Sequence, residues 1–264
     1  MKVVVFIDVQ NDFVTGPLGS KWAQRVTPDI IRFAKACRSK GYALYATADT
    51  HKATVYDDYG KNPGERKVVS GYLMTLEGER LPTEHCIEGT DGHKIVEGLV
   101  KDENRDVIIQ QSHIIDKRTF GSYLLADRIE NDFPEKQCVL GIAKGYGETL
   151  DEIIVCGFCT SICVSANAQL LRARFPNVPI TVVNNLCADI DEKSHWSALR
   201  VMTNCQMDIK DWNYNAGAEV GSFKGGFGSL EQWYLEYAGN NAFYICSRYN
   251  GMCLQVTNGF ASPF

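Results

Sequence analysis

The chain has 264 residues, of which 45% are hydrophobic and 22% are charged. This composition provides enough apolar material for a folded core and excludes intrinsic disorder as a description of the whole chain. Lys and Arg together number 27 and Asp and Glu 32, which gives a formal net charge of −5. An acidic chain of this kind, without a basic run, is a poor candidate for binding nucleic acid or anionic membranes.

Neither a membrane anchor nor an export signal is predicted. No apolar run approaches the roughly 20 residues that are needed to cross a bilayer. The N-terminal apolar segment ends at Asp8, and no small-residue cleavage site follows it, so a buried strand is the better interpretation. We therefore expect a cytoplasmic protein whose ten cysteines are mostly free, buried thiols.

Apolar segments that are typical of strands buried on both faces recur along the chain. They span residues 3–8, 43–48, 107–111, 153–156 and 180–183. Amphipathic segments of helical period occupy residues 28–38, 161–174 and 192–202. This alternation predicts an α/β fold, with an open parallel β-sheet flanked by helices on both faces.

Two regions differ from this pattern. Residues 55–70 are polar and contain Gly and Pro, so we expect a long loop. Residues 211–264 contain only six charged side chains but 12 of the 28 aromatic residues. We expect residues 1–210 to form the main domain. The aromatic-rich extension, 211–264, should then pack on that domain or on a neighbouring subunit.

Polar residues follow several of the predicted strands directly. In an open parallel sheet, the carboxyl ends of the strands meet at one edge, where ligands bind. Asp8, residues 49–51, residues 112–117 and residues 157–163 are therefore expected to converge. Asp8 could act there as a base or merely cap a loop, and Lys117 could be an ordinary solvated charge.

Three cysteines lie close together, at positions 156, 159 and 163. Cys156 and Cys159 have the spacing of a redox pair, but Cys156 falls within an apolar strand, whereas a redox thiol needs exposure. The strand would also turn Cys156 away from a three-cysteine zinc site. Cys163 falls in the first turn of the next helix, which favours a thiolate nucleophile. Three buried structural thiols remain the alternative.

A metal site is the second chemical hypothesis. Asp49 and His51 lie two residues apart beyond a strand, and with His85 they offer ligands that suit Zn, Mn or Fe. Glu77 is a candidate fourth ligand. The alternative is that Asp49 is a turn acid and His85 a loop histidine.

Six segments, taken in order, resemble the nicotinamidase/isochorismatase-like cysteine hydrolase family. They are FIDVQNDF (6–13), ATADTH (46–51), LEGERLPTEHCIEGTDG (76–92), DKRTFGSYL (116–124), VCGFCTSICVSANAQLL (155–171) and SHWSAL (194–199). The resemblance implies a parallel sheet flanked by helices and a catalytic triad of Asp8, Lys117 and Cys163. It also implies a cis peptide between Phe158 and Cys159, with the backbone N–H groups of Cys159 and Cys163 forming an oxyanion hole.

The resemblance also implies a site for one divalent metal ion (Zn, Mn or Fe), held by Asp49, His51, Glu77 and His85. This ligand set favours the nicotinamidase branch, and Asp57 and Asp58 are rivals for the place of Glu77. The implied substrate pocket contains Phe13, Leu81, Phe120 and Tyr123. Leu81 stands where the family commonly has an aromatic residue.

The implied function is metal-dependent conversion of nicotinamide to nicotinate and ammonia through a cysteine thioester, as in pyridine nucleotide salvage. Another cysteine hydrolase activity of the same superfamily, on carbamoyl-type amides or isochorismate, is the first alternative. A non-enzymatic binding or redox protein on the same scaffold is more remote. The expected partner is a small-molecule substrate, with no nucleic acid and no membrane, and self-association is left open.

Overall fold

The computed structural model describes residues 1–52, 83–133 and 149–212 with their side chains, and elsewhere only the backbone of short strands. The chain divides into two compact units, Met1–Ser222 and Phe223–Phe264. The expected boundary, after residue 210, lies twelve residues before this division. The packing of an extension 211–264 on the main domain stays a prediction.

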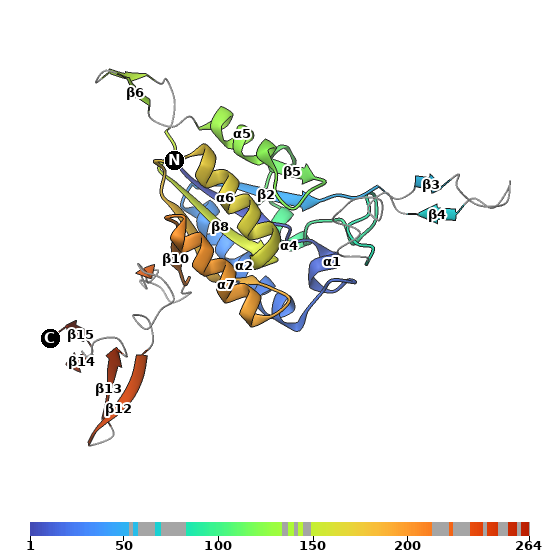
Figure 1. The fold of residues 1–264 in the computed structure, drawn as a ribbon. Coiled ribbons are helices and arrows are strands. Elements are labelled where there is room, and N and C mark those ends of the chain that lie inside the picture. Colours follow the sequence, from blue (N-terminus) through green and yellow to red (C-terminus); the bar gives the residue numbers. More distant parts are fainter. Residues whose placement is uncertain are drawn as a thin grey trace. The chain divides into compact units, whose positions relative to one another are not determined.

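A seven-stranded sheet forms the centre of the first unit, in the order β11-β10-β9-β8-β1-β2-β5 (Figure 1). Six neighbouring strands pair in parallel. They are β1 (Lys2–Ile7), β2 (Ala43–Asp49), β5 (Ile114–Lys117), β8 (Glu152–Phe158), β9 (Ile180–Ala188) and β10 (Asp208–Lys210), with β11 (Ser222–Phe223) at the edge. Val3 to Ile7 have no exposed surface, as a strand covered on both faces requires. The predicted open parallel α/β sheet is confirmed.

Helices cover the two faces of this sheet. Helix α2 (Lys21–Ser39) joins β1 to β2, and α6 (Ser165–Arg174) joins β8 to β9. These two connections run toward opposite edges, so right-handed crossovers place the helices on opposite faces (Figure 1). The other helices are α1 (Asn11–Val14), α4 (Glu97–Val100), α5 (Tyr123–Asp132) and α7 (Glu192–Asn204).

Helix α2 begins seven residues before the predicted start at Pro28. Ser20 caps it, because its side chain accepts a hydrogen bond from the backbone N–H of Ala23 at 3.0 Å. Pro28 then lies inside the helix, where Thr27 bonds through its hydroxyl to the Ala23 carbonyl at 2.7 Å. The predicted segment, 28–38, therefore left out the first two turns of the helix and its serine cap.

The predicted strand at 107–111 is wrong. Ile108 and Ile109 are buried, but this segment makes only an isolated bridge from Val107 to Lys101. The strand is β5, because Ile114 to Lys117 pair with Ala46 to Asp49 of β2. Burial of the earlier apolar run comes from loop packing, which periodicity cannot distinguish from a strand. Lys117 consequently ends the strand itself.

Two further predictions need correction. The expected long loop at 55–70 contains strands β3 (Val55–Asp57) and β4 (Lys67–Val69), which pair in an antiparallel ladder. The expected helix at 161–174 begins with a π-helical turn, Thr160–Val164, before α6. Cys163 therefore lies in a widened turn, a conformation that occurs frequently at functional sites.

The strand order reverses between β1 and β8, which makes their carboxyl ends a topological switch point. The two strands approach closely there, with Ile7 opposite Gly157. Gly157 has φ +128°, and a Cβ atom at this position would lie 2.1 Å from the Ile7 carbonyl oxygen. Glycine is required at this position, because a side chain would strain the positive φ and collide with the backbone of Ile7.

The second unit is an antiparallel sheet in the order β12-β13-β14-β15. Its strands are Trp233–Gly239, Ala242–Ser247, Cys253–Thr257 and Phe260–Pro263. A separate hairpin pairs β6 (Gln137–Val139) with β7 (Ile142–Lys144).

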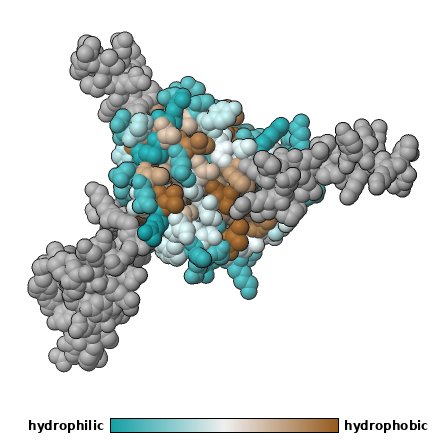
Figure 2. Space-filling model, in the orientation of Figure 1, coloured by the Kyte–Doolittle hydropathy of each residue, from teal (hydrophilic) through white to brown (hydrophobic). Residues whose placement is uncertain are grey.

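The coloured surface in Figure 2 is mixed, with hydrophobic residues reaching it at several places between hydrophilic ones. Large apolar side chains that are exposed include Tyr123 (69%) and Ile190 (68%). Among the described residues, no helix has both the length and the apolar character to cross a membrane.

Candidate active site

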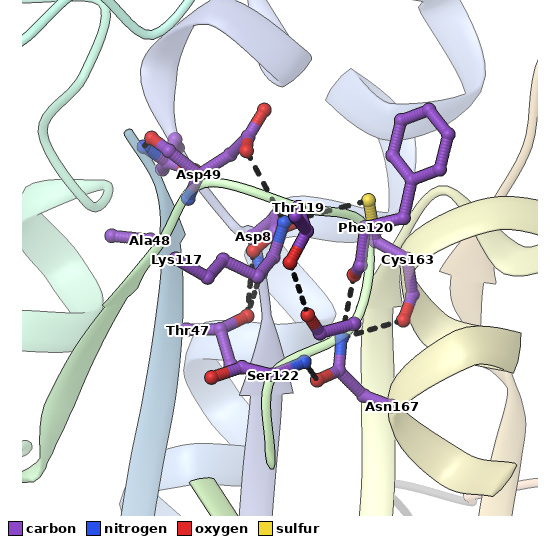
Figure 3. Close-up of polar contacts among 12 residues, drawn as sticks. Asp8, Thr47, Ala48, Asp49, Lys117, Thr119, Phe120, Ser122, Cys163 and Asn167 are labelled. Carbon is purple, nitrogen blue, oxygen red and sulfur yellow. Dashed lines mark hydrogen bonds and ion pairs between the residues drawn. The ribbon is translucent and has the colours of Figure 1, made fainter. Parts of the chain in front are cut away.

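Three buried side chains meet where β1, β2 and β5 end. Lys117 Nζ lies 2.7 Å from Asp8 Oδ2 and 3.3 Å from Asp49 Oδ1 (Figure 3). Each of the three residues is at most 3% exposed. Asp8 has φ +50°, and its carboxylate also accepts a hydrogen bond from the Thr47 hydroxyl at 2.6 Å. Neighbouring strands of the sheet thus bring together residues that are distant in the sequence.

Cys163 completes this arrangement from the turn after β8. Its Sγ lies 3.7 Å from Lys117 Nζ (Figure 3), and the residue is 4% exposed. The peptide between Phe158 and Cys159 is cis, as the family resemblance implied. Asp8, Lys117 and Cys163, hereafter the cysteine group, are brought together as the sequence analysis anticipated.

Burial and charge set the protonation of the cysteine group. Burial raises the pKa of Cys163 well above its usual value, although Lys117 opposes this effect. Burial also raises the pKa of Asp8, against the influence of Lys117. For Lys117, burial disfavours the charged form, but Asp8, Cys163 and Asp49 hold its pKa well above the usual value. A thiol therefore faces an ammonium group and a carboxylate whose basicity is increased.

Asp49, His51 and His85, hereafter the histidine group, lie beside the cysteine group. Asp49 Oδ2 is 2.9 Å from His51 Nε2 and 3.1 Å from His85 Nε2. Burial opposes ionisation of Asp49, but Lys117 and the two histidines outweigh it and lower the pKa of Asp49. For His85, burial favours the neutral form, yet its hydrogen bond with Asp49 raises its pKa.

The histidine group has the chemistry of a divalent metal site. One ligand atom from each of its residues lies within 4.8 Å of the others, and all three residues are buried. One carboxylate with two imidazoles suits Zn, Mn or Fe. Glu77 and Asp58 lie outside the described residues, and of Asp57 only the backbone is described, so the fourth ligand stays a prediction.

A cavity of about 320 Å³ opens beside the two groups. Phe13 and Phe120 line it, as do Cys159 and Cys163. Further lining residues are Pro17, Leu18, Gly19, Ser20, Ala23, Asp49, His85, Phe158, Ile162, Ala188, Asp189 and Ile190. Tyr123 is not among the described lining residues and is 69% exposed, because it begins helix α5 on the surface. Leu81 lies outside the described residues.

Asn167 ties the cysteine turn to the loop that follows Lys117. Its Nδ2 donates to the carbonyl oxygens of Cys163 (2.7 Å) and Phe120 (3.0 Å), and its Oδ1 accepts from the Ser122 N–H (2.9 Å) (Figure 3). Asn167 has no exposed surface. Asn167 was not predicted from the sequence, although its position four residues after Cys163, one helical turn on, was a usable signal.

Gln10 supports the histidine group in a similar way. Its side chain accepts from the Asp49 N–H at 2.7 Å and donates to the Asp49 carbonyl at 2.8 Å. It also donates to the His93 carbonyl at 2.7 Å. Because Gln10 is fully buried, these bonds fix the backbone at the end of β2.

His195 and the other two cysteines near Cys163 have structural positions. The Nδ1 atom of His195 lies 2.8 Å from the Thr160 hydroxyl oxygen, and its Nε2 atom lies 2.8 Å from Asn184 Oδ1. Cys156 and Cys159 are both free, and Cys156 has no exposed surface. Burial raises the pKa of Cys156 well above its usual value, which is unfavourable for a redox thiol.

Comparisons with known proteins place this geometry in context. The family described as Isochorismatase domain matches residues 2–213. No curated protein matches the chain.

Among solved structures, a nicotinamidase from Bacillus subtilis is 19% identical, with a TM-score of 0.55 over 79% of this chain and 98% of that chain. A pyrazinamidase from Pyrococcus horikoshii, in complex with zinc, is 16% identical, with a TM-score of 0.53 over 80% of this chain and 99% of that chain. An N-carbamoylsarcosine amidase from Thermoplasma acidophilum is 18% identical, with a TM-score of 0.52 over 82% of this chain and 99% of that chain.

At these identities the solved structures share the fold, whereas the family match covers most of the chain and the whole central sheet up to β10. The chain therefore belongs to the isochorismatase-like hydrolase family.

Proposed function

We propose that this protein is a metal-dependent amidohydrolase that converts nicotinamide to nicotinate and ammonia through a thioester on Cys163. The observation that carries the proposal is the position of Lys117, whose Nζ lies 2.7 Å from Asp8 Oδ2 and 3.7 Å from Cys163 Sγ. A base, a cation and a nucleophile thus lie together beside a cavity that could hold a small planar amide.

Asp8 is the proposed base. Burial keeps the Cys163 thiol protonated, since it raises the pKa of that group, so attack requires removal of the proton. Burial also makes Asp8 more basic than an exposed aspartate. Asp8 accepts the proton, Lys117 stabilises the thiolate that this transfer creates, and the sulfur attacks the carbonyl carbon, so the negative charge passes to the carbonyl oxygen.

The backbone N–H groups of Cys159 and Cys163 are proposed to stabilise the oxyanion that attack creates. Both residues line the cavity, and both belong to the turn that follows the cis peptide. Asp8 then returns its proton to the leaving nitrogen, so ammonia departs. Water hydrolyses the remaining thioester to the carboxylic acid and frees the thiol.

Asp49, His51 and His85 would hold a divalent metal ion, which when bound would orient the ring nitrogen of the substrate. The chain's own contribution is the wall of the cavity. Phe13 and Phe120 line it with apolar surface suited to a flat ring. This combination of metal donors and aromatic walls favours nicotinamide over a carbamoyl-type amide or isochorismate, the alternative substrates on the same fold.

An ammonia-release assay with nicotinamide tests the proposal. The metal-loaded protein should release ammonia, and Cys163→Ala should abolish the release while the protein stays folded. Cys205→Ala is a matched control, since it removes a half-buried thiol at the end of α7 and should leave the rate unchanged. Full activity of Cys163→Ala would overturn the cysteine mechanism, and release of ammonia only from carbamoyl-type amides would favour the alternative.

A further inference from the structure

One carboxylate in the cavity wall has no part in the chemistry proposed above. Asp189 follows the end of β9 and lines the cavity, with 3% of its surface exposed. Its Oδ2 accepts a hydrogen bond from the Ser161 N–H at 2.7 Å. Its Oδ1 accepts from the Ser161 hydroxyl at 2.9 Å and from the Ile190 N–H at 2.8 Å. Asp189 thus holds a fixed position against the turn that carries Cys163.

The charge of Asp189 acts on the cavity. Cys159 also lines the cavity, and its pKa is raised to about 12 by burial and then by the charge of Asp189. Hydrogen bonds from neutral donors stabilise a carboxylate but do not cancel its charge. An anion in the cavity would therefore meet repulsion that is strong because the surroundings are poorly solvated.

The described lining residues also include no Lys or Arg that could attract an anion. They include the carboxylates Asp49 and Asp189, and their one imidazole, His85, is hydrogen-bonded to Asp49. On the histidine side, a bound cation would offset Asp49. On the side of the cysteine turn, the described lining residues place no positive side chain against Asp189.

We propose that Asp189 is a specificity-determining residue that restricts the cavity to amides without negative charge and weakens the binding of the carboxylate product. This inference rests on the proposed function in one respect, because that function directs the reacting carbonyl toward the turn that Asp189 holds. The substrate class is therefore a neutral, planar carboxamide, and hydrolysis creates an anion beside a fixed carboxylate. Product release benefits from this repulsion, and a substrate that carries its own carboxylate is excluded.

Nicotinamide and nicotinate form a matched pair of probes, because they share the ring and differ in the charge of the side group. Calorimetry on metal-loaded Cys163→Ala protein measures the binding of both without turnover. Adding Asp189→Asn should tighten nicotinate binding by on the order of tenfold and change nicotinamide binding by less than about twofold. Glu192→Gln is the control, since it removes an exposed negative charge three residues away, outside the cavity, and should change neither.

A purely structural role of Asp189 would weaken both ligands equally. That result, or an unchanged ratio of the two dissociation constants, would overturn the proposal, as would a failure of the Cys163→Ala protein to bind either ligand. Asp189→Ser, whose hydroxyl can still accept a hydrogen bond from the Ser161 N–H, provides a second variant if Asp189→Asn does not fold. Failure of the proposed function is distinguishable, because it appears as absent ammonia release from the wild type even when Asp189→Asn shifts the binding ratio.

Discussion

The cysteine group and the histidine group lie side by side but are built differently. Asp8 follows β1 and Lys117 ends β5, with β2 between these two strands, and Cys163 comes from the turn after β8. In the histidine group, His85 belongs to the segment that follows a stretch outside the described residues. Asp49 joins the groups, with Oδ1 toward Lys117 and Oδ2 toward the histidines. The lesson is that the sheet and the turn after β8 position the cysteine group, whereas the histidine group also depends on a long connection.

Lys117→Met should break both groups and have the largest effect. The variant leaves Asp8 and Asp49 buried without their cation, which should lower the free energy of unfolding by about 3–5 kcal/mol. Urea denaturation measures the loss, and ammonia release should fall at the same time. The double variant Asp8→Asn, Lys117→Met should recover part of the stability. A double variant as unstable as the sum of its parts would contradict a direct Asp8–Lys117 interaction.

His85→Ala should distinguish the two groups, because it removes a side chain of the histidine group and leaves the cysteine group intact. Loss of a residue that only hydrogen-bonds to a metal ligand weakens metal binding by up to about 100-fold. Loss of one of the three described ligands themselves should therefore weaken metal binding by more than this. Metal titration checks this, with His93→Ala as the control, because His93 instead contacts the Thr50 hydroxyl at 2.8 Å. Equal metal loss in both variants would argue against the Asp49, His51 and His85 site.

Asn167→Ala should affect the cysteine group and spare metal binding. The carbonyl groups of Cys163 and Phe120 and the N–H of Ser122 would lose their partner, each at a cost of about 1–3 kcal/mol if no water replaces it. We expect kcat to fall, and Asn167→Asp to be worse, since it sets a carboxylate against two carbonyl oxygens. Gln169→Ala, an exposed change on α6, should be nearly neutral. An Asn167→Ala enzyme with unchanged kcat would exclude a positioning role.

His195 should give the smallest effect, visible in the pH dependence of stability. Burial lowers its pKa below 6.5 in the folded state, so the unfolded chain binds more protons in acid. Neutral His195 therefore does not reduce the free energy of unfolding above pH 6.5. As the pH falls from 6.5 toward the folded-state pKa, the free energy of unfolding decreases by at most about 1.4 kcal/mol per pH unit. His195→Gln should flatten this slope between pH 5 and 7 in denaturation series. A steeper slope in the variant would contradict a neutral, buried His195.

Much of the fold could be predicted from the sequence, because the buried parallel strands consist of apolar runs that end in polar residues. Asp8 and Asp49 follow that pattern directly. The strand at 107–111 was misplaced because Ile108 and Ile109 are buried by loop packing, and an apolar run alone does not separate the two cases. The first turns of α2 were not predicted, because the amphipathic pattern was recognised only from Pro28, which α2 accommodates in its interior.

Prediction of the site was less complete, for a physical reason. Residues that could react have recognisable side chains, whereas residues that hold them are defined by partners far away in the sequence. Asn167 bonds to Phe120 and Ser122, and Asp189 bonds to Ser161. No local sequence pattern predicts such long-range hydrogen bonds, so they can be identified only in the folded structure.

Trapping the acyl-enzyme is the most direct test of the proposed thioester on Cys163. Metal-loaded protein is mixed with nicotinamide, quenched in acid within one turnover and digested, and the peptides are weighed by mass spectrometry. We expect a nicotinoyl group on the peptide that contains Cys163, absent when Asp8→Asn or Cys163→Ala replaces the wild type. Two results would contradict a thioester on Cys163. One is hydrolysis by the wild type without this adduct, together with an undiminished rate in Cys163→Ala. The other is an adduct on a different cysteine.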